Sequence, residues 1–134
     1  MKKVLFVLLI AVCTAAAGCA KSDNSGTSVS EVDFTVVDPG NIPQELTQVI
    51  DNQKKSEFQI SSTIDGYTYI VAGYGEQPTG GYSIRVDEVC ETEAYVKVKT
   101  TLMGPAAGEA VNKLATYPYI VIKIEYTDKN IVFE

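Results

Sequence analysis

Apolar and polar side chains alternate along most of the chain after residue 56, a pattern typical of β-strands. The alternation predicts strands over residues 58–64, 67–73, 82–90, 94–102, 117–126 and 131–134, with a shorter strand over 32–36. Hairpin turns are expected at Asp65-Gly66, at Glu91-Thr92-Glu93 and at Asp128-Lys129-Asn130. Six or seven short strands favour a mainly β fold, either an antiparallel β-sandwich or a partly open barrel.

The strand over residues 67–73 is predicted to bury one face only. Its two sets of alternating side chains would then divide between the core and solvent. One set contains Tyr69, Val71 and Gly73, and the other contains Thr68, Ile70 and Ala72.

A single helix is predicted over residues 42–54, because four apolar residues recur at spacings that form one stripe. Asn41 suits the N-cap, and Pro43 falls in the first turn, where its missing N–H costs nothing. We expect this helix to cover a sheet face or to close one end of a barrel. A short helical turn is expected at 109–114. The stripe consists of Ile42, Leu46, Val49 and Ile50.

A glycine-rich loop between two predicted strands stands out from the regular pattern. It contains Pro78, Thr79, Gly80 and Gly81 and ends at Tyr82. Proline presets φ, and glycines permit positive φ and the close approach of another backbone. The loop is longer than a chain reversal requires. It is therefore either a structural hairpin or crossover, or a surface shaped to meet a partner.

Other loop residues share this character. Tyr117 and Tyr119 flank Pro118, and the long connection over residues 103–116 carries Pro105 and Gly108. Tyrosines are ordinary strand residues. Beside loops they also suit protein interfaces, where a rigid amphipathic ring contributes contact area at low entropic cost.

The first eighteen residues resemble a bacterial lipoprotein signal. Lys2 and Lys3 precede a short apolar run, and small residues lead into Cys19. The prediction is a leader over 1–18, palmitate-type lipid on Cys19, a flexible polar tether over 19–31 and one β-rich domain over 32–134. The alternative is an ordinary signal peptide cut near Ala17. Ala20 is not an acidic retention signal, so an exported protein of the outer membrane or cell surface is preferred.

The composition excludes several kinds of chemistry. The chain has no histidine, which rules out histidine-dependent nucleophilic triads. Loss of Lys2 and Lys3 with the leader would change the net charge from −6 to −8, which argues against nucleic acid. Cys90 is expected to be a small buried residue, although a thiol could also pair with another chain.

No catalytic residue, metal ligand or cofactor other than the lipid on Cys19 is predicted. The acidic group Glu88, Glu91 and Glu93 surrounds one turn. It reads as a solvated hairpin end, with a calcium site as the alternative.

The loop residues carry a family resemblance over about residues 69–125. The stretches 77–86, 96–100, 104–108 and 116–121 resemble the C-terminal domain of the PrcB family, with Pro78-Thr79-Gly80-Gly81-Tyr82 as the most specific element. That family comprises lipoproteins named for a subunit of a surface protease complex, associated with stabilising a subtilisin-like protease. The resemblance implies an accessory subunit with no catalysis of its own.

The same loops resemble, in the same order, those of chagasin-type inhibitors of papain-like cysteine proteases. Such inhibitors are immunoglobulin-like sandwiches that present three loops to the protease. Here Gln77 stands for an asparagine, Gly80 for a threonine and Tyr117 for an arginine. These departures weaken the expectation of inhibition and leave the three-loop arrangement.

The sequence therefore predicts a membrane-anchored binding module whose partner is a protein, with a protease as the expected kind. The alternatives are a chagasin-like inhibitor and a structural envelope protein without a protease partner. The predicted partner-binding residues are Pro78, Thr79, Gly80, Gly81, Tyr82, Pro105, Gly108, Tyr117, Pro118 and Tyr119.

Overall fold

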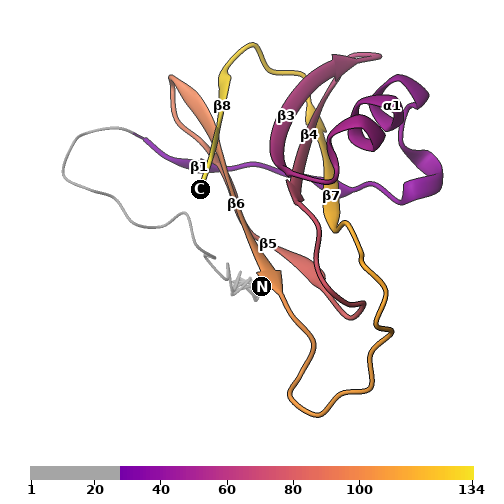
Figure 1. Ribbon diagram of the computed structural model, residues 1–134. Helices are drawn as coiled ribbons and strands as arrows, with labels where there is room; N and C mark the ends of the chain where they lie inside the picture. Colours follow the sequence, from indigo (N-terminus) through magenta and orange to yellow (C-terminus); the bar gives the residue numbers. More distant parts are fainter. Residues whose placement is uncertain (1–27) are drawn as a thin grey trace, which may run out of the picture.

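The computed structural model describes residues 28–134 and folds them into two facing four-stranded sheets (Figure 1). The predicted leader, Cys19 and residues 19–27 of the predicted tether lie outside the described residues. One sheet has the order β1 (Ser30–Glu31), β5 (Ser83–Glu91), β6 (Tyr95–Met103), β8 (Asn130–Phe133). The other has the order β2 (Thr35–Val36), β7 (Tyr119–Glu125), β4 (Tyr67–Tyr74), β3 (Glu57–Ile64).

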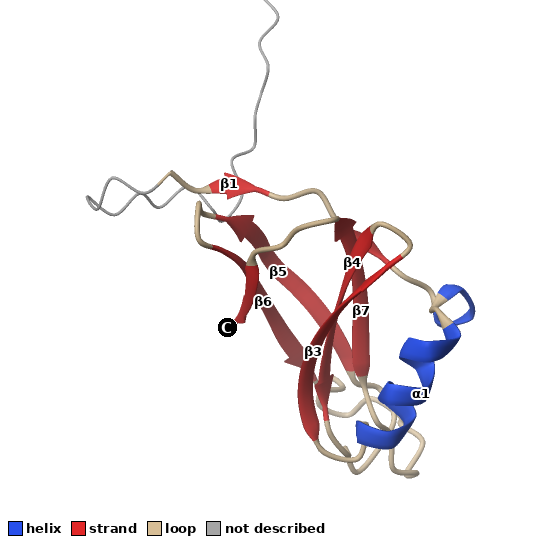
Figure 2. Ribbon diagram, turned by 90° about the horizontal axis from the view of Figure 1, so that it is seen from above, coloured by secondary structure: helices blue, strands red, loops and turns tan. Residues whose placement is uncertain are grey.

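A helix adds a third layer. Figure 2 shows α1 (Gln44–Gln53) on the side of the β2-β7-β4-β3 sheet that faces away from the other sheet. The mainly β sandwich with one covering helix is thus confirmed, and the sheets do not close into a barrel. In the described part of the chain, no helix has the length and apolar character needed to cross a membrane.

β4 is buried on both faces, so the prediction of one solvent-facing side for residues 67–73 is wrong. Tyr69 and Val71 on β4 pack under α1, whereas Ile70 packs between the sheets. The helix covers the face that a two-layer sandwich would leave in water, so β4 is apolar on both sides. The two clusters are Leu46, Ile50, Phe58, Ile64, Tyr69, Val71 and Val121 beneath the helix, and Ile70, Val89, Val96, Val98, Ile122 and Ile124 between the sheets.

The helix begins at Gln44, two residues later than predicted. A proline disfavours the helical conformation of the residue before it, and Ile42 is accordingly extended. Asn41 ends a short 3-10 helix (Pro39–Asn41) instead of capping α1. Leu46 and Ile50 are buried as the stripe predicts, but Val49 remains 37% exposed.

The single strand predicted over residues 32–36 is wrong, because this segment passes from one sheet to the other. β1, whose two residues were assigned to the tether, pairs with β5, and β2 pairs with β7. Between them, the Val32 N–H donates to Val89 at 2.9 Å, and beyond β2 the Val37 N–H donates to Val121 at 2.8 Å. The segment ties the two sheets together at this side of the sandwich.

The end of the chain also differs from the prediction. Residues 126–129 do not form a hairpin, because β7 lies in one sheet and β8 in the other. β8 instead pairs with β6, and this pair is parallel. The helical turn expected over 109–114 is absent as well, and residues 104–118 contain no regular element. Cys90 is 2% exposed, which confirms the buried thiol.

Candidate functional site

Three loop segments that were singled out in the sequence, residues 76–82, 104–110 and 116–119, meet at one end of the sandwich. The last two belong to the same connection. Residues 75–82 pass from β4 in one sheet to β5 in the other, so this loop is a crossover. Residues 104–118 return from β6 to β7. Both lie at the lower end of the view in Figure 1. We call residues 75–82 and 104–118 together the loop end.

Main-chain hydrogen bonds join the two loops directly. Gln77 and Thr116 exchange a pair of N–H···O bonds of 2.8 and 3.0 Å, as in an antiparallel ladder. The Gly80 N–H donates to the Asn112 carbonyl at 2.8 Å. At the base of the loops, the Tyr74 N–H donates to Pro118 at 3.0 Å. These bonds limit the motion of each loop relative to the other.

Side chains add to this connection. The Thr116 hydroxyl donates to the Thr79 carbonyl at 2.7 Å, and the Gln77 amide donates to the Tyr74 carbonyl at 3.1 Å. Tyr74 also reaches across the sandwich, since its hydroxyl lies 2.6 Å from that of Thr100 on β6. The first loop is therefore attached to the second loop at Thr79 and to the end of β4 at Gln77.

The carboxylate of Glu76 changes the pKa of one of the loop tyrosines, Tyr117. The Tyr117 hydroxyl donates a hydrogen bond of 3.0 Å to the Glu76 carboxylate. This bond, together with the negative charge of Glu76, raises the pKa of Tyr117 above its usual value. The Lys54 ammonium lies 5.7 Å from the centre of the same ring. Tyr117 thus connects the loop end to the C-terminal end of α1.

Gly81 meets the second loop where no side chain fits well. Its φ is +87°, a conformation that disfavours residues with a Cβ. A Cβ placed there would lie 3.0 Å from Cβ of Pro105 and 3.1 Å from Cγ1 of Val111. Nearby, the Tyr82 ring lies against Gly104. The glycines of the Pro78–Tyr82 stretch therefore allow the two loops to pack against each other.

The predicted site residues differ in how they contribute. Pro78, Gly81 and Gly108 are exposed, whereas Tyr119 packs beside the cluster beneath α1 and supports the core. The half-buried residues form the contact between the loops or its border; these are Thr79, Gly80, Tyr82, Pro105, Tyr117 and Pro118.

Sequence reasoning missed the most exposed apolar residue of the loop end. Leu114 is 66% exposed, and Met103, at the end of β6, is 38% exposed. Both had been assigned to the long connection over residues 103–116, and Leu114 to the end of the helical turn expected there. A large apolar residue among alanines, glycines and polar residues was the available signal. Leu114 gives the loop end an exposed apolar side chain, and Met103 adds another at the adjoining end of β6.

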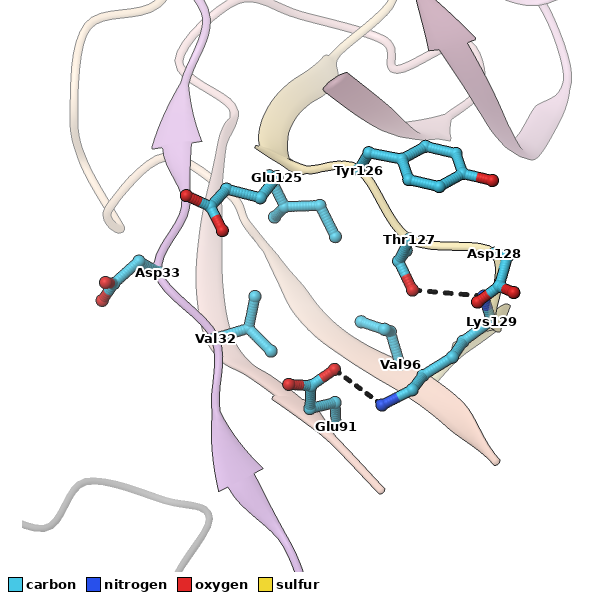
Figure 3. Close-up of a pocket in the computed structure, with 10 residues that line it drawn as sticks. Val32, Asp33, Glu91, Val96, Glu125, Tyr126, Thr127, Asp128 and Lys129 are labelled. Atoms are coloured by element: carbon cyan, nitrogen blue, oxygen red, sulfur yellow. Dashed lines mark hydrogen bonds and ion pairs between the residues drawn. The ribbon is translucent and has the colours of Figure 1, made fainter. Parts of the chain in front are cut away.

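A hollow of about 500 Å³ lies between the sheets at the opposite end of the sandwich (Figure 3). Val32, Val96 and Ile124 are among its apolar lining residues. The Lys129 ammonium is bound to the Glu91 carboxylate at 2.9 Å and to the Thr92 carbonyl at 2.8 Å. In the described part of the chain, no three acidic or thiol side chains are placed to hold a metal ion.

One carboxyl on β5 has a perturbed pKa. Asp87, at a bulge in β5, accepts hydrogen bonds from the Thr101 hydroxyl and from Arg85. These bonds lower the pKa of Asp87 below its usual value. The group lies on β5 beyond the loop end, so we assign it a structural role in holding the bulge.

Comparison with known protein families supports the resemblance inferred from the sequence. Residues 68–125 match the family model PrcB C-terminal. The predicted PrcB resemblance is confirmed. No curated protein matches the chain, and no solved structure does.

The PrcB C-terminal segment begins in β4 and ends with β7. It therefore contains both loops of the loop end, the strands that carry them and every predicted partner-binding residue. It leaves out α1, β3 and β8. The family points to a subunit associated with a protease complex.

Proposed function

We propose that this chain is an accessory subunit that binds a protease through its loop end and stabilises it. In this proposal a lipid on Cys19 holds the protein at the membrane of the cell envelope. The chain supplies no catalytic group to the reaction. The PrcB match supports the association with a protease complex, and the structure supports the choice of surface.

The observation that carries this choice is the double connection between the loops. The Gln77–Thr116 pair and the Gly80–Asn112 bond hold two segments from distant parts of the sequence in one arrangement. A surface that is already ordered loses less conformational entropy when a partner binds. The loop end thus has the rigidity expected of an interface, although it has no regular secondary structure.

The exposed apolar side chains provide the binding energy in this proposal. Leu114 in the second loop and Met103 at the end of β6, where that loop begins, are both exposed. Interfaces typically depend on a few apolar anchors that become fully buried in the complex. Leu114 is the best candidate for such an anchor because it is the most exposed large apolar residue described.

The direction of the chain suits a membrane anchor. β1 pairs with Cys90 and Glu91, at the end of β5 that lies farthest from the loop end. A tether of eleven residues from Cys19 would reach about 20 Å on average. The anchor would therefore hold the sandwich by one end and leave the loop end directed away from the lipid.

Exchange of one exposed leucine tests the proposal. The tagged full-length chain is expressed in its native envelope, extracted in mild detergent and captured with its bound proteins. We expect Leu114→Asp to lose the protease that the unchanged chain captures. Val132→Asp is the matched control, since Val132 is also exposed, at 42%, but lies on β8. Capture of the same protease by Leu114→Asp would show that the loop end is not the interface.

Inhibition is the second candidate function, because the three loops that resemble chagasin-type loops do meet at one end of the sandwich. Activity of the captured protease with and without added chain separates the two functions. A stabiliser prolongs the activity during incubation, whereas an inhibitor lowers the initial rate. If neither capture nor either effect is observed, the remaining alternative is a structural envelope protein.

A further inference from the structure

β3 presents a long free edge. Its eight residues pair with β4 along one side, without a register shift, and no described strand pairs with its other side. Proteins usually protect such an edge with lysine, proline, a bulge or a covering segment, since its unpaired main-chain groups can bind another strand. β3 contains neither lysine nor proline. The other edge strands, β1, β2 and β8, have only two to four residues.

A groove runs beside this edge. It has a volume of about 320 Å³ and lies between residues 45–49 of α1 and residues 60–64 of β3. Val49, which projects from α1 without full burial, forms part of its wall. The residues that line the groove are Glu45, Leu46, Val49, Ile60, Ser61, Ser62 and Ile64.

We propose that the edge of β3 and this groove bind an extended peptide segment of a partner protein, which adds to the sheet as a further strand. Only an extended backbone matches the regular spacing of the free N–H and C=O groups along a strand edge. Alternate side chains of the added strand would lie on the side of the sheet that carries α1. An apolar side chain at such a position would enter the groove beside Leu46 and Val49.

The charges near the groove define the peptide further. Glu45 lines the groove, and Asp65 follows β3 at the same end. Lys54 and Lys55 lie beyond the opposite end of the strand, before Glu57. The favoured peptide therefore carries an arginine or lysine where it passes Glu45 and Asp65, next to alternating apolar residues.

A second copy of this chain fits the edge less well. Two β3 strands that pair antiparallel about Ser61 would place Glu57 opposite Asp65 of the second copy, at both ends of the pair. Like charges directly opposite each other destabilise a strand pair. Two acidic grooves would also meet each other. A basic partner segment avoids both conflicts.

This surface is separate from the loop end. Residues 57–64 and α1 lie outside the segment that matches PrcB C-terminal. The inference goes beyond the proposed function and does not depend on it, because peptide binding at β3 can be measured with loop variants such as Leu114→Asp.

Peptide titration of the isotopically labelled full-length chain, in lipid nanodiscs, tests the inference by nuclear magnetic resonance. The probe is the designed peptide Thr-Val-Thr-Ile-Thr-Val-Thr-Arg, and the control peptide has methylated main-chain nitrogens. We expect the probe to shift the amide signals of β3 and to slow their hydrogen exchange. The methylated peptide should bind at least about tenfold more weakly, because it cannot donate ladder bonds.

Two variants of neighbouring residues locate the binding. Ser62→Trp should reduce the affinity for the probe peptide by about tenfold or more, because Ser62 lines the groove. Thr63→Trp should change that affinity by less than about twofold, because the exposed Thr63 side chain lies on the other side of the sheet. Failure of the unchanged protein to bind the probe would overturn the inference. It would also be overturned by equal effects of the two variants, or by protection of β3 that depends on protein concentration without peptide, which would indicate a second copy.

Discussion

At Gly81, the backbone conformation and the packing of neighbouring residues both require a glycine. Its positive φ and the closeness of Pro105 and Val111 both oppose a side chain. We predict that Gly81→Ala destabilises the protein by about 1–3 kcal/mol and weakens capture of the partner, because the strained backbone and the lost loop contact act together. Urea denaturation measures the stability, and the capture experiment measures binding.

Gly108 provides the control for this variant. It has a similar φ of +80°, but nothing lies within 4 Å of the position that its Cβ would occupy. Gly108→Ala should therefore show only the conformational cost, about 1 kcal/mol. Equal losses for the two variants would mean that the contact between the loops contributes nothing to stability.

Tyr117 offers a direct measure of the loop geometry. The hydrogen bond to Glu76 raises its pKa in the folded state, so the stabilisation is fully present below the unfolded pKa of about 10 and is lost as pH rises through the folded pKa. We predict that Glu76→Gln lowers the Tyr117 pKa, observed by titration of its ring signals. Glu109→Gln should leave the pKa unchanged, since Glu109 instead accepts from the Ala106 N–H.

Individual site residues were predictable where local chemistry decides them. The two glycines after Thr79 indicated a close backbone approach, and the structure places Gly81 against the second loop. Leu114 was not predictable in this way, because its exposure depends on how residues 104–118 fold against a segment far away in sequence. Tyr119 was predicted to lie at the start of a strand and also to bind the partner. It does lie in β7, paired with Gly73, but it packs beside the cluster beneath the helix.

At the scale of elements, the hairpin of β3 and β4 depends on a small residue opposite an aromatic one. Gly73 is paired with Phe58, and a Cβ at Gly73 would lie 2.1 Å from the Phe58 ring. The ring thus occupies the space above the glycine and contributes to the cluster beneath α1.

We predict that Gly73→Ala costs about 1–3 kcal/mol, because the Phe58 ring must move within a packed core. Adding Phe58→Leu should restore part of that loss, so the double variant is more stable than the sum of the single effects implies. Gly40→Ala serves as the control, with open space around the position. Strict additivity in a denaturation series would contradict this account.

Elements formed by local signals were predicted well, and those formed by distant pairing were not. Asp65 and Gly66, both with positive φ, make the two-residue turn that their sequence indicates. By contrast, alternation over 32–36 does not reveal that the chain changes sheets there. The alternation of β8 likewise does not reveal its partner strand. That partner is β6, which is far away in the sequence and pairs with β8 in parallel.

At the scale of the whole molecule, β1, the first described strand, pairs with the end of β5 that is opposite to the loop end. We predict that Cys19→Ser releases the protein from membranes, because the lipid would be lost and the acidic chain is not attracted to anionic lipid. Fractionation of cells into membrane and soluble parts checks this. As a control, adding Ser22→Cys to the Cys19→Ser variant should not restore membrane attachment. If the Cys19→Ser variant remains in the membrane fraction, the anchor proposal is wrong.

The way the chain enters the sandwich also determines how the protein responds to a pulling force. β1 and β2 each pair with the neighbouring strand through only two residues, whereas β4 pairs with β7, and β5 with β6, over much longer ladders. A load applied at residue 28 would therefore peel residues 28–36 away first. At about 3.3 Å for each extended residue, this would release roughly 30 Å of additional chain. Residues 28–36 would therefore detach under load while the remaining strands of the two sheets, and the loops they carry, stay folded.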